Sequence, residues 1–421
     1  MHTIETINYV IMCLFFVCYA YQFAYIPLAW LPARKRQTSK PDPDHTFAVL
    51  IAARDEAEVI GALVDSLCAQ TYSSQQIGIF VASDRCSDRT AEIARAHGAV
   101  AFERSAGGRS GKGLVLDFLL HEMQRSGCVG YDAYIVLDAD NVVDAHFIAN
   151  MNRTFSAGYD IVTCYRNSKN YGDNWISAGY GLWFLRESRY LNGVRMRLGS
   201  SCAVSGTGFL FSGSVLRACG GWHFFLLTED IEFTIDNVVR GIRIGYCADA
   251  VIYDEQPVRF RQSWAQRLRW SRGYLQVFAR YGRRLFVGIA HGSFSCYDMA
   301  MSILPAAVLA VTGLVINLGA AVVSLVQTGT WGVVVTSVLL SGISLYLTLF
   351  VIGAITTATE WRKIRCPAPK KILYVFTFPL FMMTYLPIVI ESLFVTPEWT
   401  HIAHTRNVPA RQLRSDSQST V

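Results

Sequence analysis

An apolar run near the middle of the chain ends on two carboxylates. The segment YIVLDAD, residues 134–140, is predicted to be a buried strand that finishes at Asp138 and Asp140. Hard oxygen ligands at this spacing suit Mg²⁺ or Mn²⁺, which take few protein carboxylates and fill their remaining positions with phosphate oxygens and water. The two aspartates are therefore candidate ligands of a metal ion that holds a phosphorylated molecule; the alternative is an ordinary acidic strand end.

A glycine-rich stretch that presents a lysine precedes this strand. Residues 107–113 read GGRSGKG, but a P-loop needs glycine at position 106 and serine or threonine at position 113, where this chain has Ala106 and Gly113. The mismatch argues against an ATPase. Lys112 remains either a point charge suited to a diphosphate or part of an exposed basic turn.

Two further segments carry groups that could do chemistry. In LLTEDIEFT, residues 226–234, Glu229 and Asp230 stand where a helix is predicted to begin, so they could supply a general base or simply favour the helix N-terminus. The segment QSWAQRLRW, residues 262–270, contains Gln266, Arg269 and Trp270. Both segments are short, so their meaning depends on the elements around them.

The apolar runs between residues 45 and 165 predict the framework that positions these groups. Strands are expected at 47–52, 77–82, 100–103, 133–137 and 160–165, and helices at 56–69, 87–96, 113–124 and 144–155. This alternation is typical of a mostly parallel, doubly wound α/β sheet. Ligands bind at the carboxyl edge of such sheets, where Asp55, Asp84, Asp138 and Asp140 are expected to gather.

Three of the motifs occur together in a known family. LDAD at 137–140, TED at 228–230 and QRLRW at 266–270 stand in the order, and at about the spacing, of the processive family 2 glycosyltransferases. Over about residues 47–284 the chain resembles the hyaluronan, chitin-oligosaccharide, poly-N-acetylglucosamine and cellulose synthases. The resemblance implies a Rossmann-like GT-A fold and an enzyme that takes its sugar from a UDP-sugar.

The resemblance also implies roles on the donor side. Asp84, within SDRCSD, would contact the uridine, and Lys112 would approach the diphosphate. Asp138 and Asp140 would hold the donor through Mg²⁺ or Mn²⁺, with Asp140 favoured as the direct ligand. The implied donor-contacting set is Asp55, Asp84, Lys112, Asp138, Asp140, Gln266, Arg269 and Trp270.

For catalysis, the resemblance implies that Asp230, with Glu229 beside it, removes the proton of the acceptor hydroxyl. The hydroxyl would attack the anomeric carbon while Arg269 offsets charge on departing UDP, so one displacement would turn an α-linked donor into a β-linked product. Trp270 would stack on a sugar of the acceptor. Further acceptor contacts are implied for Gly206, Thr207 and Gly208 of VSGTGFLFSG, residues 204–213.

Composition indicates a membrane protein. Of the 421 residues, 52% are hydrophobic and 17% charged. Apolar blocks at 7–30, 302–326, 332–357 and 372–394 are each long enough to cross a bilayer, although a cleaved signal peptide is the alternative for the first. Basic residues between the last two blocks favour the cytoplasmic side, and the eleven cysteines lack paired spacing. We therefore expect a multi-pass plasma-membrane protein with a cytoplasmic catalytic domain.

The predicted organisation has five parts. They are an anchor at 1–33, a GT-A domain at 44–258, amphipathic interfacial helices with the QxxRW motif at 259–298, three spans at 299–396, and a polar tail at 397–421. Four spans in all would leave the tail outside. Its arginines, Arg406, Arg411 and Arg414, favour the cytoplasmic side instead, so one late block could be re-entrant or interfacial.

The basic, aromatic segment at 259–286 is the predicted interfacial helix. Trp264, Leu268, Ser271, Leu275 and Phe278 fall at helical spacing, so this stripe would enter the bilayer while arginines meet anionic head groups. A net charge of +6 would also allow nucleic-acid binding. The adjacent apolar blocks favour the membrane, and no nucleic-acid partner is expected.

Three functions remain compatible with the sequence. The first is a processive β-glycosyltransferase that extends and exports a polysaccharide, with UDP-N-acetylglucosamine as first choice of donor and UDP-glucose as second. The second is a non-processive enzyme that adds one sugar to a lipid, as ceramide glucosyltransferases do. The third, a transporter with a nucleotide-binding domain, is disfavoured by the missing P-loop and the nearly uncharged blocks. Three late spans and a basic interfacial helix favour the first.

Overall fold

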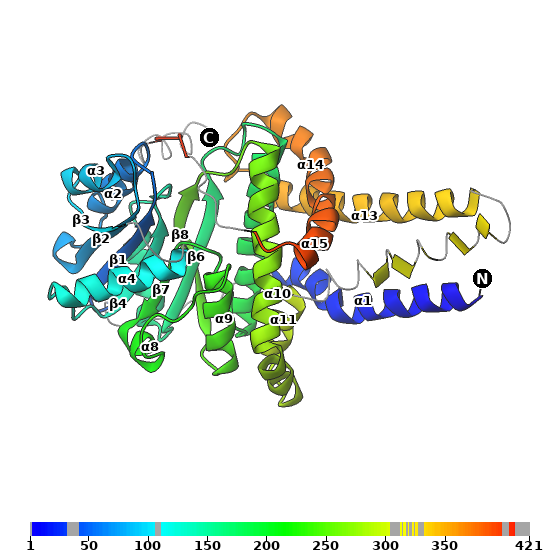
Figure 1. The fold of residues 1–421 in the computed structure, drawn as a ribbon, viewed down its shortest axis with the longest axis horizontal. Helices are drawn as coiled ribbons and strands as arrows, with labels where there is room; N and C mark the ends of the chain where they lie inside the picture. The colour runs from blue at the N-terminus through cyan, green and yellow to red at the C-terminus, as the bar shows by residue number, and fades with distance from the viewer. Residues whose placement is uncertain are drawn as a thin grey trace.

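An α/β domain makes up the body of the molecule, and further helices extend from it to one side (Figure 1). The computed structural model describes residues 2–31, 42–105, 111–303, 332–397 and 404–408, together with scattered residues between 312 and 326. Much of the predicted apolar block at 302–326 and most of the glycine loop before Lys112 lie outside the described residues.

One eight-stranded mixed sheet runs through the domain. Its strands are β1 (Phe47–Ala53), β2 (Ile77–Asp84), β3 (Val100–Arg104), β4 (Ala133–Asp138), β5 (Val142–Val143), β6 (Ile161–Ser168), β7 (Phe209–Ser212) and β8 (Ile244–Asp254), in the order β3-β2-β1-β4-β7-β6-β8-β5. The strands predicted from the alternating pattern are confirmed. The mostly parallel sheet is confirmed in part: β1, β2, β3, β4, β6 and β8 run in one direction, but β7 lies antiparallel between β4 and β6, and β5 is antiparallel to β8. Strand β7 was not predicted, because it has only four residues, glycines flank it, and its partner strands are distant in sequence.

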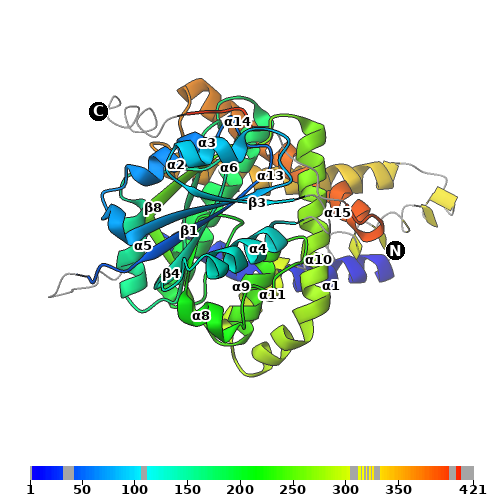
Figure 2. The same ribbon diagram turned by 60° about the vertical axis from the view of Figure 1, so that its left-hand side comes forward.

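Helices cover both faces of the sheet (Figure 2). They are α2 (Ile60–Cys68), α3 (Thr90–Ala96), α4 (Lys112–Arg125), α5 (Phe147–Ser156), α6 (Trp175–Arg186), α7 (Gly193–Leu198), α8 (Gly213–Ala218) and α9 (Glu229–Val239), with helical turns at Ser74–Gln76 and Glu187–Asn192. Alternate residues of β1 enter opposite cores: Leu50 packs in the core that includes α4, and Val49 in the core that includes α2. Burial on both faces explains why β1 is a continuous apolar run.

A long helix, α10 (Phe260–Ala290), runs along the domain and is followed by α11 (Phe294–Ile303). The helix matches the predicted interfacial segment, but its apolar stripe does not face outward. Leu268 is buried, and the Trp264 indole donates a hydrogen bond to Glu391 at 2.7 Å. Because α10 packs against α9, α11 and α15 (Tyr385–Phe394), protein covers the surface that was expected to enter a bilayer.

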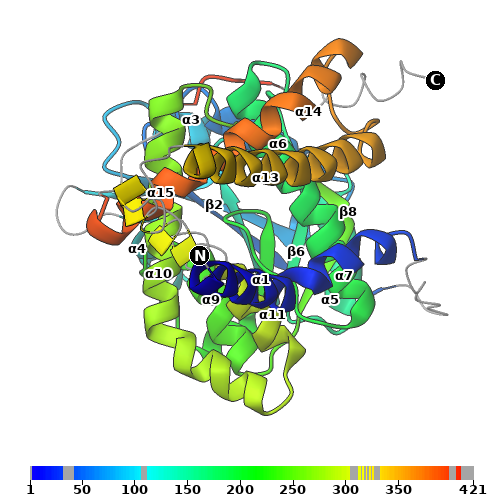
Figure 3. The same cartoon turned by 90° about the vertical axis from the view of Figure 1, so that its right-hand side faces the viewer.

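Two helices, α1 (His2–Leu28) and α13 (Gly332–Thr359), project from the domain in the same direction (Figures 1 and 3). By length and composition, two segments of the described residues could cross a membrane, Val338–Thr359 and Ala368–Phe394, and Cys13–Leu28 is a shorter apolar stretch. The second segment is not one straight helix. It consists of α14 (Ala368–Met383) and α15, which meet at Thr384 and pack against α6 and α10.

The described tail residues, 404–408, return to the α/β domain. Nδ1 of His404 lies 2.8 Å from a carboxylate oxygen of Glu56. The backbone N–H of Arg406 donates to Glu255 at 2.8 Å, and its guanidinium donates to both oxygens of Asp173 at 2.9 Å. The tail therefore lies on the same side as the domain, which agrees with the preference of its arginines and contradicts a tail across a membrane from it.

Candidate active site

The carboxyl edge of the sheet borders a cavity of about 620 Å³. The strands β1, β2 and β4 are parallel neighbours, and their register places Ala52 beside Asp138, while Asp84 ends β2. The loops that follow therefore converge, as expected for an open α/β sheet. Of the residues predicted for the site, those that line the cavity are Asp84, Lys112, Asp138, Asp140, Gly206, Glu229, Asp230, Gln266, Arg269 and Trp270.

Asp84 ends β2 in a basic environment. Its carboxylate is nearly buried and accepts hydrogen bonds from Arg104 at 2.7 Å and from Arg85 at 3.2 Å. Two guanidinium partners compensate the buried charge and fix the orientation of the side chain. Asp84 is thus a rigid acceptor at the cavity wall.

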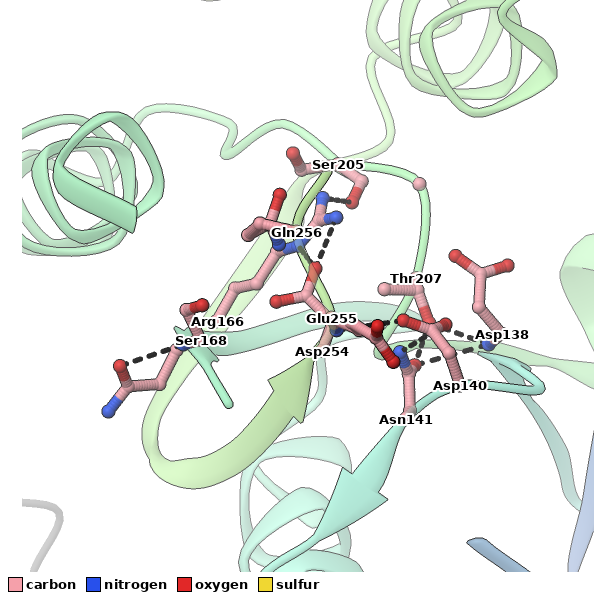
Figure 4. A network of polar contacts seen from close by, with 12 residues as sticks. Asp138, Asp140, Asn141, Arg166, Ser168, Ser205, Thr207, Asp254, Glu255 and Gln256 are labelled. Carbon is pink, nitrogen blue, oxygen red and sulfur yellow. Dashed lines mark hydrogen bonds and ion pairs between the residues drawn. The ribbon is translucent and has the colours of Figure 1, made fainter. Parts of the chain in front are cut away.

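Asp140 is held by a polar network just after β4 (Figure 4). The Glu255 N–H donates to its Oδ2 at 2.8 Å, and the Asn141 amide donates to its Oδ1 at 3.2 Å. The Thr207 hydroxyl braces the same turn, accepting from the Asp138 N–H at 2.9 Å and donating to Asn141 at 2.5 Å. The Asp138 carboxylate stays outside this network and forms an ion pair with Lys112.

Lys112 opens α4 and links β4 to the loop before β7. Besides contacting Asp138, its Nζ donates to the Gly206 carbonyl oxygen at 2.8 Å. Burial alone would lower the pKa of Lys112, but Asp138 and Glu229 outweigh it and raise the pKa, so the ammonium stays charged. Gly113 has a packing role, because a Cβ there would lie 1.9 Å from the Phe224 carbonyl oxygen. The close packing of α4 against the Phe224 backbone thus places the Lys112 ammonium at the acidic carboxyl edge of the sheet.

Glu229 and Asp230 begin α9 and line the same cavity. Oδ2 of Asp230 accepts from the Gly206 N–H at 2.6 Å, which orients the carboxylate. Burial and the neighbouring Asp230 raise the pKa of Glu229 to about 7, and burial also raises the pKa of Asp230. A raised pKa makes a carboxylate a stronger proton acceptor, so this pair has the properties of a general base.

One face of α10 supplies Gln266, Arg269 and Trp270 to the cavity. Within the described residues, Oε1 of Gln266 and Nε of Arg269 are buried without a hydrogen-bond partner. The Trp270 indole is fixed by edge contacts, with ring centroids 5.7 Å from Tyr180 and 6.2 Å from Phe184. Buried polar atoms without partners are rare, so the first two side chains have capacity for a ligand.

The ends of β6 and β8 contribute charged groups that the sequence analysis missed. Nε of Arg166 donates to Oδ2 of Asp254 at 2.6 Å, and Glu255 follows directly. Oδ1 of Asp254 is buried and has no hydrogen-bond partner among the described residues. The signal was present, because β8, IGYCADAVIYD, is an apolar run that ends on an acid, as YIVLDAD is.

His404 is a second residue of the cavity wall that was not predicted. Burial alone would lower its pKa, but Asp140 and Glu56 outweigh it and raise the pKa to about 10, so the ring is positively charged. His404 and Glu56 are 348 positions apart in the sequence. No sequence spacing could have joined them.

Three predicted residues, Asp55, Thr207 and Gly208, do not line the cavity. Oδ1 of Asp55 accepts from the Ser87 N–H at 2.6 Å and ties two loops together. Thr207 is buried in the turn around Asp138, and a Cβ on Gly208 would meet Sγ of Cys164 at 2.3 Å. These residues shape the backbone around the cavity.

Asp55 also belongs to a second acidic cluster, with Cys86 and Asp88, whose ligand atoms are close enough to hold a metal ion. Its groups are already engaged. Oδ1 of Asp88 accepts from the Thr90 N–H at 3.0 Å, its Oδ2 accepts from the Ala57 N–H at 3.0 Å, and Cys86 accepts from the Asp55 N–H. The cluster is accounted for by its loop contacts.

The class of the protein follows from the fold and the site together. Residues 43–273, more than half of the 421-residue chain, match the family model described as glycosyltransferase like family 2. The chain belongs to this family, and it is a glycosyltransferase with a GT-A-like fold built on a mixed sheet.

Individual relatives differ in their named products. The chain is 25% identical over 247 residues to a β-monoglucosyldiacylglycerol synthase of Synechocystis, covering 57% of this chain and 50% of that protein. It is 27% identical over 242 residues to a poly-β-1,6-N-acetyl-D-glucosamine synthase of Staphylococcus aureus, covering 55% of each. The chain thus spans about half the length of the curated relatives it matches.

A solved structure supports the fold over almost the whole chain. It is the mannosyltransferase PcManGT from Pyrobaculum calidifontis in complex with GDP-mannose and Mn²⁺. The two share a TM-score of 0.61 at 15% identity, covering 93% of this chain and 99% of that one. The similarity concerns the fold.

Proposed function

We propose that the protein is a membrane-bound, metal-dependent, inverting glycosyltransferase that moves a sugar from a UDP-sugar to an acceptor hydroxyl. The observation that carries this proposal is the single cavity in which Lys112, the acidic turn after β4, the start of α9 and one face of α10 meet. Its charges suit a diphosphate at one wall and a proton acceptor at another. The donor candidates are UDP-N-acetylglucosamine and UDP-glucose, since the named products of the two relatives contain these sugars.

A divalent cation fits the acidic turn. Asp138 and Asp140 would hold it with hard carboxylate oxygens, which Mg²⁺ and Mn²⁺ prefer. The partnerless Oδ1 of Asp254 shows that the cluster has unused acceptor capacity, and burial together with Asp140 raises the pKa of Asp254. When bound, the ion supplies charge neutralisation to the diphosphate leaving group.

The other charged residues support a single displacement. One oxygen of Asp230 is held by the Gly206 N–H, and the carboxylate can take the proton of the acceptor hydroxyl. The acceptor oxygen bonds to the anomeric carbon as the bond from that carbon to UDP breaks on the opposite face. Lys112 and Arg269 offset the charge left on UDP, while Trp270 packs on the sugar. Attack from the opposite face gives a β-linked product from an α-linked donor.

The membrane arrangement in this proposal has three crossings. They are α1, the block at 302–326 and α13, with the catalytic domain in the cytoplasm and α14 and α15 at the membrane surface. The return of the tail to the domain supports an odd number of crossings with the N-terminus outside. The motifs themselves are compatible with a polysaccharide product that is exported and with a single transfer to a lipid.

The test uses purified full-length protein with each UDP-sugar and Mg²⁺ or Mn²⁺. We expect UDP release that EDTA abolishes and added Mn²⁺ restores. Asp140→Ala should weaken Mn²⁺-dependent donor binding by at least about 10-fold, measured by calorimetry, since removal of groups that merely support metal ligands already costs 10–100-fold. Asp132 is an exposed acid that does not line the cavity, so Asp132→Ala is the matched control. Metal-independent activity would contradict the metal site, and an absence of UDP release from either donor would contradict the function.

A further inference from the structure

The catalytic cavity has a second end with a different chemistry. Beyond Trp270, it is lined by Met301 and Ile303 of α11, Leu345 and Leu349 of α13, and Leu386 and Val389 of α15. The α13 pair is spaced i, i+4 and the α15 pair i, i+3, so both side chains of each of these pairs can lie on one face of their helix. The site therefore joins a charged end, where the donor is proposed to bind, to a hydrocarbon-like end between three helices.

The apolar end opens where the protein exposes hydrocarbon to its surroundings. On α13, Leu340 is 63% exposed and Ile343 is 54% exposed, and on α1, Phe16 is 68% exposed. Figure 3 shows α1, α13 and α15 on the same side of the molecule. Exposed apolar side chains gathered on projecting helices mark a surface that belongs in a lipid bilayer. The cavity thus leads from the catalytic carboxylates toward a source of lipid.

We infer that the acceptor is an amphiphilic membrane lipid whose hydroxyl-bearing head group reaches Asp230 while its hydrocarbon chains lie between α11, α13 and α15. This inference rests on the proposed function and names the substrate class of that site. The apolar end belongs to the same cavity as Asp230 and Trp270. A molecule whose chains bind in the apolar end can therefore present its head group to the proposed base, as an acceptor must.

A polysaccharide fits the same path poorly. It carries hydroxyl groups along its whole length, and each one that leaves water without a partner is costly. In the described cavity wall formed by α11, α13, α14 and α15, the polar side chains are Ser302, Tyr385 and Ser392. The Ser302 hydroxyl donates to the Asp298 carbonyl at 2.8 Å and the Ser392 hydroxyl to the Val389 carbonyl at 2.7 Å. Little hydrogen-bonding capacity remains for a sugar chain.

Aromatic side chains mark the junction between the two ends. Phe184, Trp270 and Tyr274 all line the cavity, and the first two are in edge contact. The rings of Trp270 and Tyr274 each carry one polar atom, which suits a boundary between an apolar and a polar environment. A head group at this level would place its hydroxyl near Asp230, and its chains would continue into the apolar end.

The experiment uses full-length protein in phosphatidylglycerol vesicles that contain dioleoylglycerol as the acceptor probe. Radiolabelled UDP-glucose and UDP-N-acetylglucosamine are supplied with Mn²⁺, and products are divided by chloroform extraction and sized. We expect a chloroform-soluble product that carries one sugar. An alcohol-insoluble polymer, or UDP release with label only in free sugar, would overturn the lipid acceptor and leave the proposed transferase standing. No UDP release would overturn the proposed function itself.

Variants of α13 test the path independently of the probe's identity. Leu345→Trp narrows the apolar end, and Leu340→Trp places the same bulk on the same helix outside the cavity wall. We expect Leu345→Trp to raise the KM for the vesicle acceptor by about tenfold or more, because the larger side chain weakens acceptor binding. Leu340→Trp should keep the wild-type KM and the wild-type UDP release without acceptor, and calorimetric UDP binding to Leu345→Trp shows that this variant is folded. Equal KM values for the two variants would overturn the assigned path.

Discussion

Two buried clusters of charge in this molecule have opposite designs. In the first, Arg195 donates to both oxygens of Asp298 at 2.7 and 2.8 Å, and the hydroxyls of Tyr21 and Tyr25 donate to the same carboxylate at 2.8 and 3.1 Å. This cluster ties α1 and α11 to α7. Every oxygen of Asp298 is engaged, so the cluster serves the fold.

The second cluster lies in the catalytic cavity and is left incomplete. Lys112 is shared among Asp138, Glu229 and Asp230, and burial that is not fully compensated raises the pKa values of Glu229 and Asp230. Among the described residues, Arg269 and Asp254 each keep a buried atom without a partner. The comparison teaches that matched charge stabilises a fold, whereas unmatched charge at a cavity is available to a ligand. Each prediction below tests one side of this contrast.

Removing the proposed base should have the largest effect. Asp230→Asn keeps an oxygen for the Gly206 N–H but removes the proton acceptor, so kcat should fall about 10²–10⁴-fold with donor binding intact. Steady-state kinetics and calorimetric UDP binding measure the two quantities. Asp132→Asn, at an exposed site, is the control. Transfer at the wild-type rate would remove Asp230 as the base.

Breaking the structural cluster should affect stability instead. Asp298→Asn leaves the buried Arg195 uncompensated and should destabilise the protein by about 3–5 kcal/mol, measured by thermal or denaturant unfolding in detergent. The activity of the molecules that remain folded should be unchanged. Replacing both partners with Arg195→Met and Asp298→Leu should restore much of the loss, because no charge is then left alone. Unaltered unfolding of the single variant would contradict this assignment.

The raised pKa of Glu229 predicts an acid limb in the activity profile. The base Asp230 acts deprotonated and titrates as a pair with the adjacent Glu229, so kcat should rise with pH through the region near 7, to which burial and Asp230 raise the pKa of Glu229. The stability of the fold should change in the opposite direction to kcat. The raised pKa of Glu229 means that the folded state favours the protonated carboxyl group, so stability is lost as pH rises from about 4.5 to about 7. Glu229→Gln removes the negative neighbour of Asp230 and should move the limb to lower pH. A limb that does not move would show that the pair titrates independently.

An exposed pair should have the smallest effect. The Arg406 and Asp173 side chains are 53% and 26% exposed, so water screens their attraction. Arg406→Ala should change stability by at most about 1 kcal/mol and leave kcat unchanged. Differential scanning fluorimetry of the variant beside Asp298→Asn gives the comparison directly. A loss as large as that of Asp298→Asn would show that the tail supports the fold.

Local patterns identified much of the fold and the site before the structure was known. Strand-length apolar runs, helical spacing and terminal acids identified β1, β2, β3, β4 and β6, the turn of Asp138 and Asp140, and the start of α9 at Glu229. These succeed because alternation of buried strands and helices is a property of neighbouring residues. Asp254 had the same signal at the end of β8, but the alternation of strands and helices was analysed only between residues 45 and 165, so β8 was missed.

Contacts between elements that are far apart in the chain could not be predicted from the sequence. The antiparallel insertion of β7 between β4 and β6, and the covering of α10 by α15, depend on segments far apart in the chain. Asp55, Thr207 and Gly208 carried the expected residue types, yet their side chains serve loops and packing. A side chain's direction relative to a cavity follows from the backbone of distant elements, which residue spacing does not encode.

The sequence by itself determined a family 2 glycosyltransferase with a carboxylate turn, a lysine at the start of a helix and apolar blocks at both ends, because these depend on residue type and short spacing. Only the tertiary structure decided that His404 and Asp254 border the site, that the tail returns to the domain, and that the cavity continues into an apolar end. The physical reason is burial. Which charges are compensated and which surfaces remain open depends on what packs against them.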